Sequence, residues 1–226
     1  MRRAIVLIGA LIVGLLGVWG GVQALASTGF GQPGGLPVLP DDRASSGHAR
    51  PFEVNGVVLV NARHPVAPEY VPELAEPHQL TPAAHRAYVA MVKAAKKAGR
   101  TIVWRVGYRS YDTQAEVLAS SIETRGSYRA ALAYTAEPGC SEHQLGLAVD
   151  IAAPKARGLA FADTQEFAWM REHAHEYGFI LRYPDGKSDI TGIAYEPWHY
   201  RYLGVDHARA FGPWSSLTLE EYLGGR

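Results

Sequence analysis

The sequence of 226 residues contains a single cysteine, Cys140, so no disulfide can form within the chain. It also lacks an excess of charge of either sign, because 22 lysines and arginines balance 22 aspartates and glutamates. This balance gives no long-range attraction toward nucleic acid or anionic lipid, so we expect no nucleic-acid partner. Hydrophobic residues make up 47% of the chain and charged residues 19%. The composition therefore predicts one compact domain with a short additional segment.

One long hydrophobic run is present, close to the N-terminus. It begins at Ala4 after two arginines and leads to an Ala-Leu-Ala sequence at 24–26. This order is typical of a secretory signal peptide. Because Gln23 is the one polar residue between positions 4 and 26, an uncleaved membrane anchor is the alternative. We predict a signal peptide or anchor at 1–26 and an exported protein of the cell envelope or extracellular space, touching the membrane only if this segment is uncleaved.

Residues 27–50 are rich in Ser, Gly and Pro and predict a flexible linker. The folded domain is expected to span 51–226, where apolar patterns of helical and strand period alternate irregularly. Such a pattern predicts an α+β fold with a small, mostly antiparallel sheet and flanking helices. The expected strands are 57–60, 101–106, 147–149, 179–182 and 194–199, and the expected helices are 82–98, 111–123 and 164–177.

Three residues are expected to cap the starts of these helices. Thr81 precedes a proline that suits the first helical position, and Ser110 precedes the second helix. Asp163 would cap the third helix, with Glu166 completing a pair that resembles a capping box.

Two segments carry the residue types needed for metal-assisted hydrolysis: 141–150 (SEHQLGLAVD) and 195–200 (YEPWHY). A catalytic zinc ion takes three protein ligands and leaves one position for water. His143, Asp150 and His199 supply two imidazoles and one carboxylate. With a single carboxylate the site keeps a positive charge, which lowers the pKa of bound water. Glu196, three residues before a ligand, is the candidate that takes the proton of this water.

The spacing of the second segment raises a geometric question. In a regular strand Glu196 and His199 would point to opposite faces, because their separation is odd. Pro197 argues against a regular strand, and a kink or bulge there would bring both side chains to one pocket. Gly146 is expected to allow a close backbone approach or an unusual turn beside His143.

Taken alone, each of the four proposed site residues could have a purely structural role instead. These residues are His143, Asp150, Glu196 and His199. The combination of both segments favours the site. Cys140 is expected to be a small buried side chain rather than a zinc ligand. His173 and His175 lie two apart on a predicted helix and point to different sides, so we expect surface or boundary positions.

Several ordered motifs resemble the VanY-like D-alanyl-D-alanine carboxypeptidases. Residues 141–150 match the family pattern S-x-H-x-x-G-x-A-x-D, and 196–199 match its second motif, E-x-W-H. Residues 107–110 followed by Gln114 are similar to its G-Y-R-S-x-x-x-Q element. The likeness extends over roughly residues 56–204.

This resemblance implies a zinc metallopeptidase of bacterial cell-wall metabolism, with the fold shared by Hedgehog signalling domains and DD-peptidases. It implies zinc ligands at His143, Asp150 and His199 and a catalytic base at Glu196. It also implies that Arg109 steadies the substrate and the developing oxyanion.

The resemblance further implies substrate contacts at Ser110, Gln114 and Ser141, as well as at Arg109. Two alternatives stay open, because Arg109 could form a structural ion pair and Ser110 could serve only as a helix cap. The implied partner is a peptidoglycan stem peptide, and we expect a monomer.

The resemblance predicts removal of C-terminal D-alanine from stem peptides. An L,D-carboxypeptidase or a D,D-dipeptidase acting on the same wall peptides is the alternative, because the motifs describe the zinc site and not the specificity pocket. A non-catalytic zinc-bearing module that binds the cell wall is an alternative of another class, and the presence of Glu196 argues against it.

Overall fold

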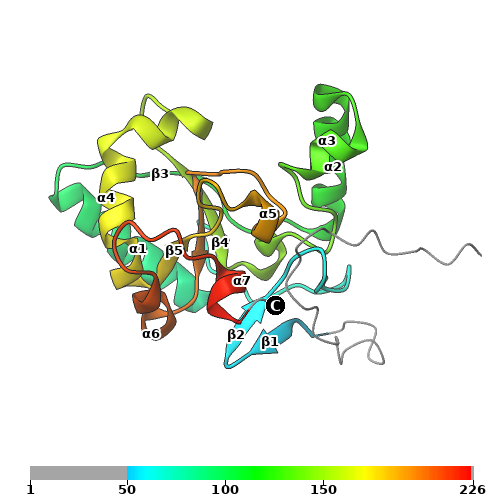
Figure 1. Ribbon diagram of the computed structural model, residues 1–226. Helices are drawn as coiled ribbons and strands as arrows, with labels where there is room; N and C mark the ends of the chain where they lie inside the picture. The colour runs from blue at the N-terminus through cyan, green and yellow to red at the C-terminus, as the bar shows by residue number, and fades with distance from the viewer. Residues whose placement is uncertain (1–49, 225–226) are drawn as a thin grey trace, which may run out of the picture. The chain divides into compact units, whose positions relative to one another are not determined.

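The computed structural model describes residues 50–224 (Figure 1). The predicted signal peptide or anchor and residues 27–49 of the predicted linker lie outside this part of the chain. Within residues 50–224 no helix has the length and apolar character needed to cross a membrane.

The strands are β1 (Phe52–Val54), β2 (Val57–Leu59), β3 (Val103–Val106), β4 (Ala148–Ala152), β5 (Phe179–Leu181) and β6 (His199–Tyr202). The α-helices are α1 (Pro82–Lys97), α2 (Tyr111–Arg125), α3 (Tyr128–Leu132), α4 (Gln165–His173), α5 (Ser188–Thr191), α6 (Val205–Ala208) and α7 (Leu219–Tyr222).

The central sheet has four strands in the order β3-β4-β6-β5, and every neighbouring pair is antiparallel. The predicted α+β fold with a small antiparallel sheet is therefore confirmed. A separate hairpin joins β1 and β2 through Asn55 and Gly56, both at positive φ. This Asn-Gly pair is the sequence that favours a two-residue hairpin turn.

One face of the sheet is apolar and is covered by α1 and α4, which lie together beside it in Figure 1. Side chains alternate along a strand, so Val149 and Ile151 of β4 and Tyr200 of β6 all point to this face. Met91 of α1 and Met170 of α4 pack against them. This burial provides the main driving force that holds the helices to the sheet.

The starts of the three long helices follow the predicted pattern with one error. Thr81 stands at the N-cap of α1, although its side chain makes no capping hydrogen bond, and Ser110 caps α2 by accepting from the amide of Thr113. The predicted cap of α4 at Asp163 is wrong. Asp163 ends the 3-10 helix η3 (Gly158–Asp163), whereas Thr164 has the extended backbone a cap needs and accepts from the amide of Phe167.

The opposite face of the sheet meets the hairpin and the C-terminal helix. Ile180 of β5 packs in a second apolar cluster with residues of β1 and β2 and with Leu219 of α7. Figure 1 shows α7, in red, beside the cyan hairpin. A capping box between Thr218 and Glu221 fixes the start of α7.

Candidate metal centre

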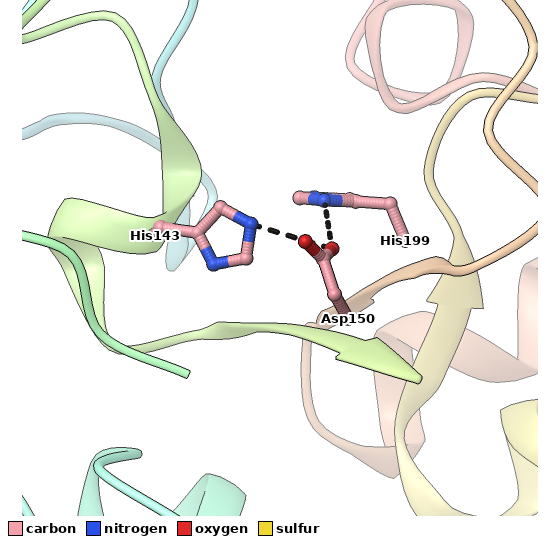
Figure 2. A group of neighbouring side chains, drawn as sticks. All are labelled: His143, Asp150 and His199. Atoms are coloured by element: carbon pink, nitrogen blue, oxygen red, sulfur yellow. Dashed lines mark hydrogen bonds and ion pairs between the residues drawn. The ribbon is translucent and has the colours of Figure 1, made fainter. Parts of the chain in front are cut away.

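Two predicted metal ligands lie side by side on neighbouring strands. Asp150 of β4 and His199 of β6 are direct partners in the antiparallel register, so their side chains share a face. That face is opposite to the one that carries Val149 and Tyr200. His199 Nδ1 lies 3.0 Å from Asp150 Oδ1 (Figure 2). The strand pairing itself therefore brings together residues 49 positions apart in the sequence.

His143 reaches the same carboxylate from the 3-10 helix η2 (Glu142–Leu145). Its Nδ1 donates to the carbonyl oxygen of Gly107 over 2.7 Å, so Nε2 is the ring nitrogen that faces Asp150, 3.3 Å from Oδ1 (Figure 2). Gly107 passes so close to residue 78 that a Cβ would meet the carbonyl oxygen of His78 at 2.0 Å. A glycine is therefore required where the backbone orients the imidazole.

Gly146 ends η2 with φ of 63°, and a Cβ there would meet Leu74 at 2.8 Å. The prediction of a close approach or an unusual turn at Gly146 is therefore confirmed. Because the chain reverses at Gly146, it can enter β4 within two residues and place Asp150 beside His143.

These three side chains form a group suited to a divalent cation. One ligand atom from each lies within 4.8 Å of the others, and both imidazoles are nearly completely buried. Two nitrogen donors and one carboxylate match the ligand preference of a catalytic zinc ion. The carbonyl of Gly107 holds the tautomer of His143 that leaves Nε2 free, an arrangement found behind metal-binding histidines.

Glu196 lies next to this group because of a turn. The expected strand over 194–199 is wrong: residues 194–196 are irregular, and pairing begins only at His199. A turn at Pro197 and Trp198 intervenes, in which the amide of His199 donates to the carbonyl of Glu196. The predicted kink at Pro197 is therefore confirmed, and it places Glu196 Oε2 3.9 Å from His199 Nδ1.

The charges of the metal-free site are strongly coupled. Burial raises the pKa of Glu196 to about 8, while the nearby His199 opposes this rise and Asp150 adds to it. Burial lowers the pKa of His199, but the carboxylates of Asp150 and Glu142 beside its two ring nitrogens outweigh it and raise the pKa to about 9. Burial would raise the pKa of Asp150, yet His143 and His199 hold it well below its usual range. Without a cation, protons on His199 and Glu196 therefore compensate the buried carboxylates.

A cavity of about 200 Å³ is lined by the three metal-ligand candidates, by Glu196 and by Arg109. Arg109 Nη1 donates to Gln114 Oε1 over 2.7 Å, and Gln114 Nε2 donates to the carbonyl of Ala136 over 2.7 Å. Arg109 Nη2 lies 4.0 Å from Asp150 Oδ2. Gln114 thus fixes the position of Arg109 and also lines the cavity.

The two predicted serine contacts are placed differently. Ser141 lines the cavity beside His143. Ser110 is not among the residues that line it, and its hydroxyl accepts from the amide of Thr113 at the start of α2. The structure therefore gives Ser110 the helix-cap role that the sequence left open, and its contact with substrate stays a prediction.

Sequence reasoning missed Glu142, which lies within the first motif. Its Oε1 accepts from Arg182 Nε over 2.8 Å and from Arg201 Nη1 over 2.7 Å, and its Oε2 lies 3.6 Å from His199 Nε2. Burial would raise the pKa of Glu142, but Arg182 and Arg201 hold it well below its usual range. The available signal in the sequence was that Glu142, an acidic residue, lies within a segment that otherwise predicts burial.

The remaining candidates fall outside the centre. Cys140 is buried, as predicted, and burial raises its pKa to about 11. His173 and His175 are half-buried at the end of α4 and in the 3-10 helix η4 (Ala174–Tyr177), which agrees with the predicted boundary positions.

Comparison with known proteins identifies the family. Residues 77–205 match the sequence profile of VanY: D-alanyl-D-alanine carboxypeptidase. A curated relative, the putative carboxypeptidase YodJ of Bacillus subtilis, is 44% identical over 138 residues, which are 58% of this chain and 49% of the relative. The chain therefore spans about half the length of that relative.

Two solved structures are similar over most of their length. One is the LdcB LD-carboxypeptidase, with a TM-score of 0.66 and 34% identity over 78% of this chain and 94% of that chain. The other is a mutant of the vancomycin-resistance D,D-pentapeptidase VanY in complex with Zn(II), with a TM-score of 0.65 and 33% identity over 75% and 99% of the two chains. Because the profile covers more than half of the chain and includes every residue of the centre, the protein belongs to the VanY family of D-alanyl-D-alanine carboxypeptidases.

Proposed function

We propose that this protein is a zinc-dependent carboxypeptidase that removes the C-terminal D-alanine from peptidoglycan stem peptides. The observation that carries the proposal is the meeting of His143, Asp150 and His199 in one cavity, with Glu196 beside them. Similarity to a VanY enzyme in complex with Zn(II), and to a VanYB structure with D-alanine-D-alanine, supports the choice of metal and substrate. The carboxylate of Glu196 in the cavity disfavours a non-catalytic wall-binding module.

The residues of the centre have two roles in the proposed reaction, metal binding and proton transfer. His143, Asp150 and His199 would hold the zinc ion, which when bound acidifies water and polarises a carbonyl group. Glu196 is close enough to take the proton of the attacking water and later deliver it to the leaving amine. A cation held by the three ligands also favours the ionised form of Glu196, which a base requires.

Arg109 supplies recognition of the substrate. A carboxypeptidase must bind a free C-terminal carboxylate, and a guanidinium offers a planar set of donors for it. Gln114 accepts from Nη1 alone, so the other donors of Arg109, which lines the cavity, are not bound to Gln114. The same group lies near enough to the metal ligands to stabilise an oxyanion as it develops.

The variant Glu196→Gln tests the assignment of the base. We expect it to keep zinc, because Glu196 is not a ligand, and to lose about 100- to 10,000-fold in kcat on a pentapeptide stem. Zinc content by metal analysis and D-alanine release by mass spectrometry are measured on the same sample. Unchanged turnover would remove Glu196 from the mechanism, and activity that survives complete removal of metal by a chelator would refute the zinc enzyme.

An L,D-carboxypeptidase is the second candidate, because LdcB is as similar to this chain as VanY is. The two activities differ in the stem peptide that they shorten. Release of D-alanine from a pentapeptide supports the D,D-activity, and release from a tetrapeptide alone supports the L,D-activity. Release of a D-alanyl-D-alanine unit would instead indicate a dipeptidase.

We also propose that residues 1–26 export the protein to the compartment that contains its wall substrate, and that it acts there as a monomer. The support is the apolar run that ends in a small-residue cleavage pattern. The mass of the protein recovered from the cell envelope and the medium tests the first point, because cleavage leaves a chain beginning at position 27. Sedimentation velocity tests the second.

A further inference from the structure

We propose that Glu142 is a positioning residue that fixes the tautomer of His199. Its Oε2 accepts a hydrogen bond from the N–H of His199 Nε2, so that Nδ1 presents its lone pair to the metal. The inference rests on the proposed function, because it assumes that His199 holds zinc. It assigns a role to a buried acid that neither binds the metal nor lines the cavity.

The first support is that two buried polar atoms face each other. His199 Nε2 and Glu142 Oε2 lie 3.6 Å apart, and neither has a hydrogen-bond partner among residues 50–224. Both side chains are at most 4% exposed. An unpaired buried donor and acceptor are costly, and a movement of about half an ångström closes a normal N–H···O bond between them.

The second support is that the other oxygen of Glu142 already accepts two hydrogen bonds. Oε1 accepts from Arg182 and from Arg201, so the carboxylate cannot rotate without breaking two charge-assisted bonds. Arg201 Nη2 in turn donates to the carbonyl of Val58 over 2.6 Å. Oε2 is therefore held in place as an acceptor, and an ionised carboxylate has no proton to offer.

The third support is that the arginine behind Glu142 is itself anchored. Arg182 Nη1 and Nη2 donate to the two oxygens of Glu220 over 2.8 and 2.6 Å, and Glu220 belongs to α7. The chain of contacts runs from α7 through Arg182 and Glu142 to His199. Two acids and two guanidinium groups balance in charge, so Glu142 can remain ionised although it is buried.

The fourth support is the parallel with the other imidazole. His143 presents Nε2 to Asp150 because the carbonyl of Gly107 accepts from Nδ1. His199 presents Nδ1 because the acceptor, Glu142, lies behind Nε2. The two imidazoles thus use opposite nitrogens toward the metal, and each is set by an acceptor on its far side.

Glu142→Gln tests the inference because it reverses one hydrogen bond while keeping the shape. The two arginines are donors, so the amide oxygen must face them and the NH₂ group must face His199 Nε2. His199 would then carry its proton on Nδ1, the atom that should bind zinc. We expect zinc affinity, measured by competition with a chelator on the full chain, to fall about 10- to 100-fold.

Glu220→Gln is the matched control, because it makes the same change one step further from the site. It disturbs Arg182 but leaves the acceptor behind His199 in place. We expect it to lower the melting temperature of the metal-free protein while zinc affinity stays within about threefold, since one such contact away from the ligands carries little of the tautomer preference. Equal loss of zinc affinity in both variants would show that Glu142 acts only through general stability.

A second measurement decides the case even if Glu142→Gln does not fold. In the zinc-loaded wild-type protein, ¹⁵N–¹H correlation spectra of histidine should show a slowly exchanging proton on Nε2 of His199. A proton on Nδ1, or rapid exchange at Nε2, would overturn the inference. Absence of zinc binding by the wild type would instead refute the proposed function, so the two failures are distinguishable.

Discussion

The two faces of strands β4 and β6 share one backbone but carry side chains of different kinds. On one face Val149 and Tyr200 pack under α1 and α4 in an apolar cluster. On the other face, one residue along each strand, Asp150 and His199 meet at the metal centre. Because side chains alternate, the same hydrogen-bonded ladder supports burial on one side and chemistry on the other.

This contrast separates stability from function. The apolar face gains free energy from water exclusion, whereas the site face keeps coupled charges buried, which costs free energy unless every charge is paired. The comparison predicts that substitutions on the site face damage catalysis while the fold persists, and that those on the apolar face do the reverse. The following experiments test it, from the largest expected effect to the smallest.

Asp150→Asn should have the largest effect. It keeps the size of the side chain but removes the charge that both imidazoles share. Losing the metal's contribution of several kcal/mol corresponds to a fall in kcat/KM of more than about 1000-fold. Peptide hydrolysis and zinc content are measured, with the exposed Asp163→Asn as control. Near-normal hydrolysis by Asp150→Asn would contradict the assignment of catalysis to this face of the sheet.

Met91→Ala probes the apolar face. Met91 is completely buried in α1, and truncation there should lower the free energy of unfolding by about 2–5 kcal/mol. Urea unfolding followed by circular dichroism measures this change. The kcat/KM of the folded fraction should stay close to wild type, and the exposed Lys96→Ala should alter neither quantity. A change in kcat/KM for Met91→Ala would mean that the two faces are not independent.

Arg109→Lys should lower kcat/KM about 10- to 100-fold, because a lysine cannot reproduce the planar contact with a carboxylate, nor the bond to Gln114 in the same geometry. Stem peptides with a free and with an amidated C-terminus are compared. Wild type should strongly prefer the free acid, and the variant should lose this preference. If the preference survives, another group recognises the carboxylate.

The pH dependence of zinc binding should show the smallest effect per step, a change of about tenfold for each pH unit. His199 must lose its proton to bind zinc, and its pKa is raised to about 9 in the metal-free protein. Zinc affinity should therefore rise about tenfold per pH unit up to about 9 and then level off. Chelator competition at several pH values measures the slope. An affinity that does not change between neutral pH and pH 9 would contradict the raised pKa.

The raised pKa values of His199 and Glu196 also determine whether the metal-free protein gains or loses stability as the pH rises. The folded metal-free protein holds protons on Glu196 and His199 more tightly than the unfolded chain does. The stability from the His199 proton is fully present below its unfolded pKa of about 6.5 and is lost as the pH rises through about 9. Glu196 contributes in the same direction between about 4.5 and 8. The melting temperature of the metal-free protein should therefore fall as the pH rises toward 9.

Much of the sheet and of the long helices could be predicted from the sequence, because their apolar periodicity is strong. The strand over 194–199 could not, since Tyr195 and Trp198 suggest β-structure while Pro197 turns the chain. The cap of α4 was misplaced by one residue, because Asp163 and Thr164 are both good caps and only the preceding 3-10 helix decides between them.

The metal ligands could be predicted because their chemistry is specific and their motifs are ordered. Their geometry could not, since the pairing of Asp150 with His199 depends on a register between distant strands. Glu142 was missed for a related reason. Its partners, Arg182 and Arg201, lie 40 and 59 residues away, and no local pattern indicates that they converge.

The position of Glu220 in the chain has a consequence for biosynthesis. Arg182 is completely buried and depends on a carboxylate 38 residues further along. A nascent chain that has not yet presented residue 220 outside the ribosome holds the guanidinium groups of Arg182 and Arg201 against the single carboxylate of Glu142, which disfavours the native arrangement. Zinc capture is therefore expected to follow the docking of α7.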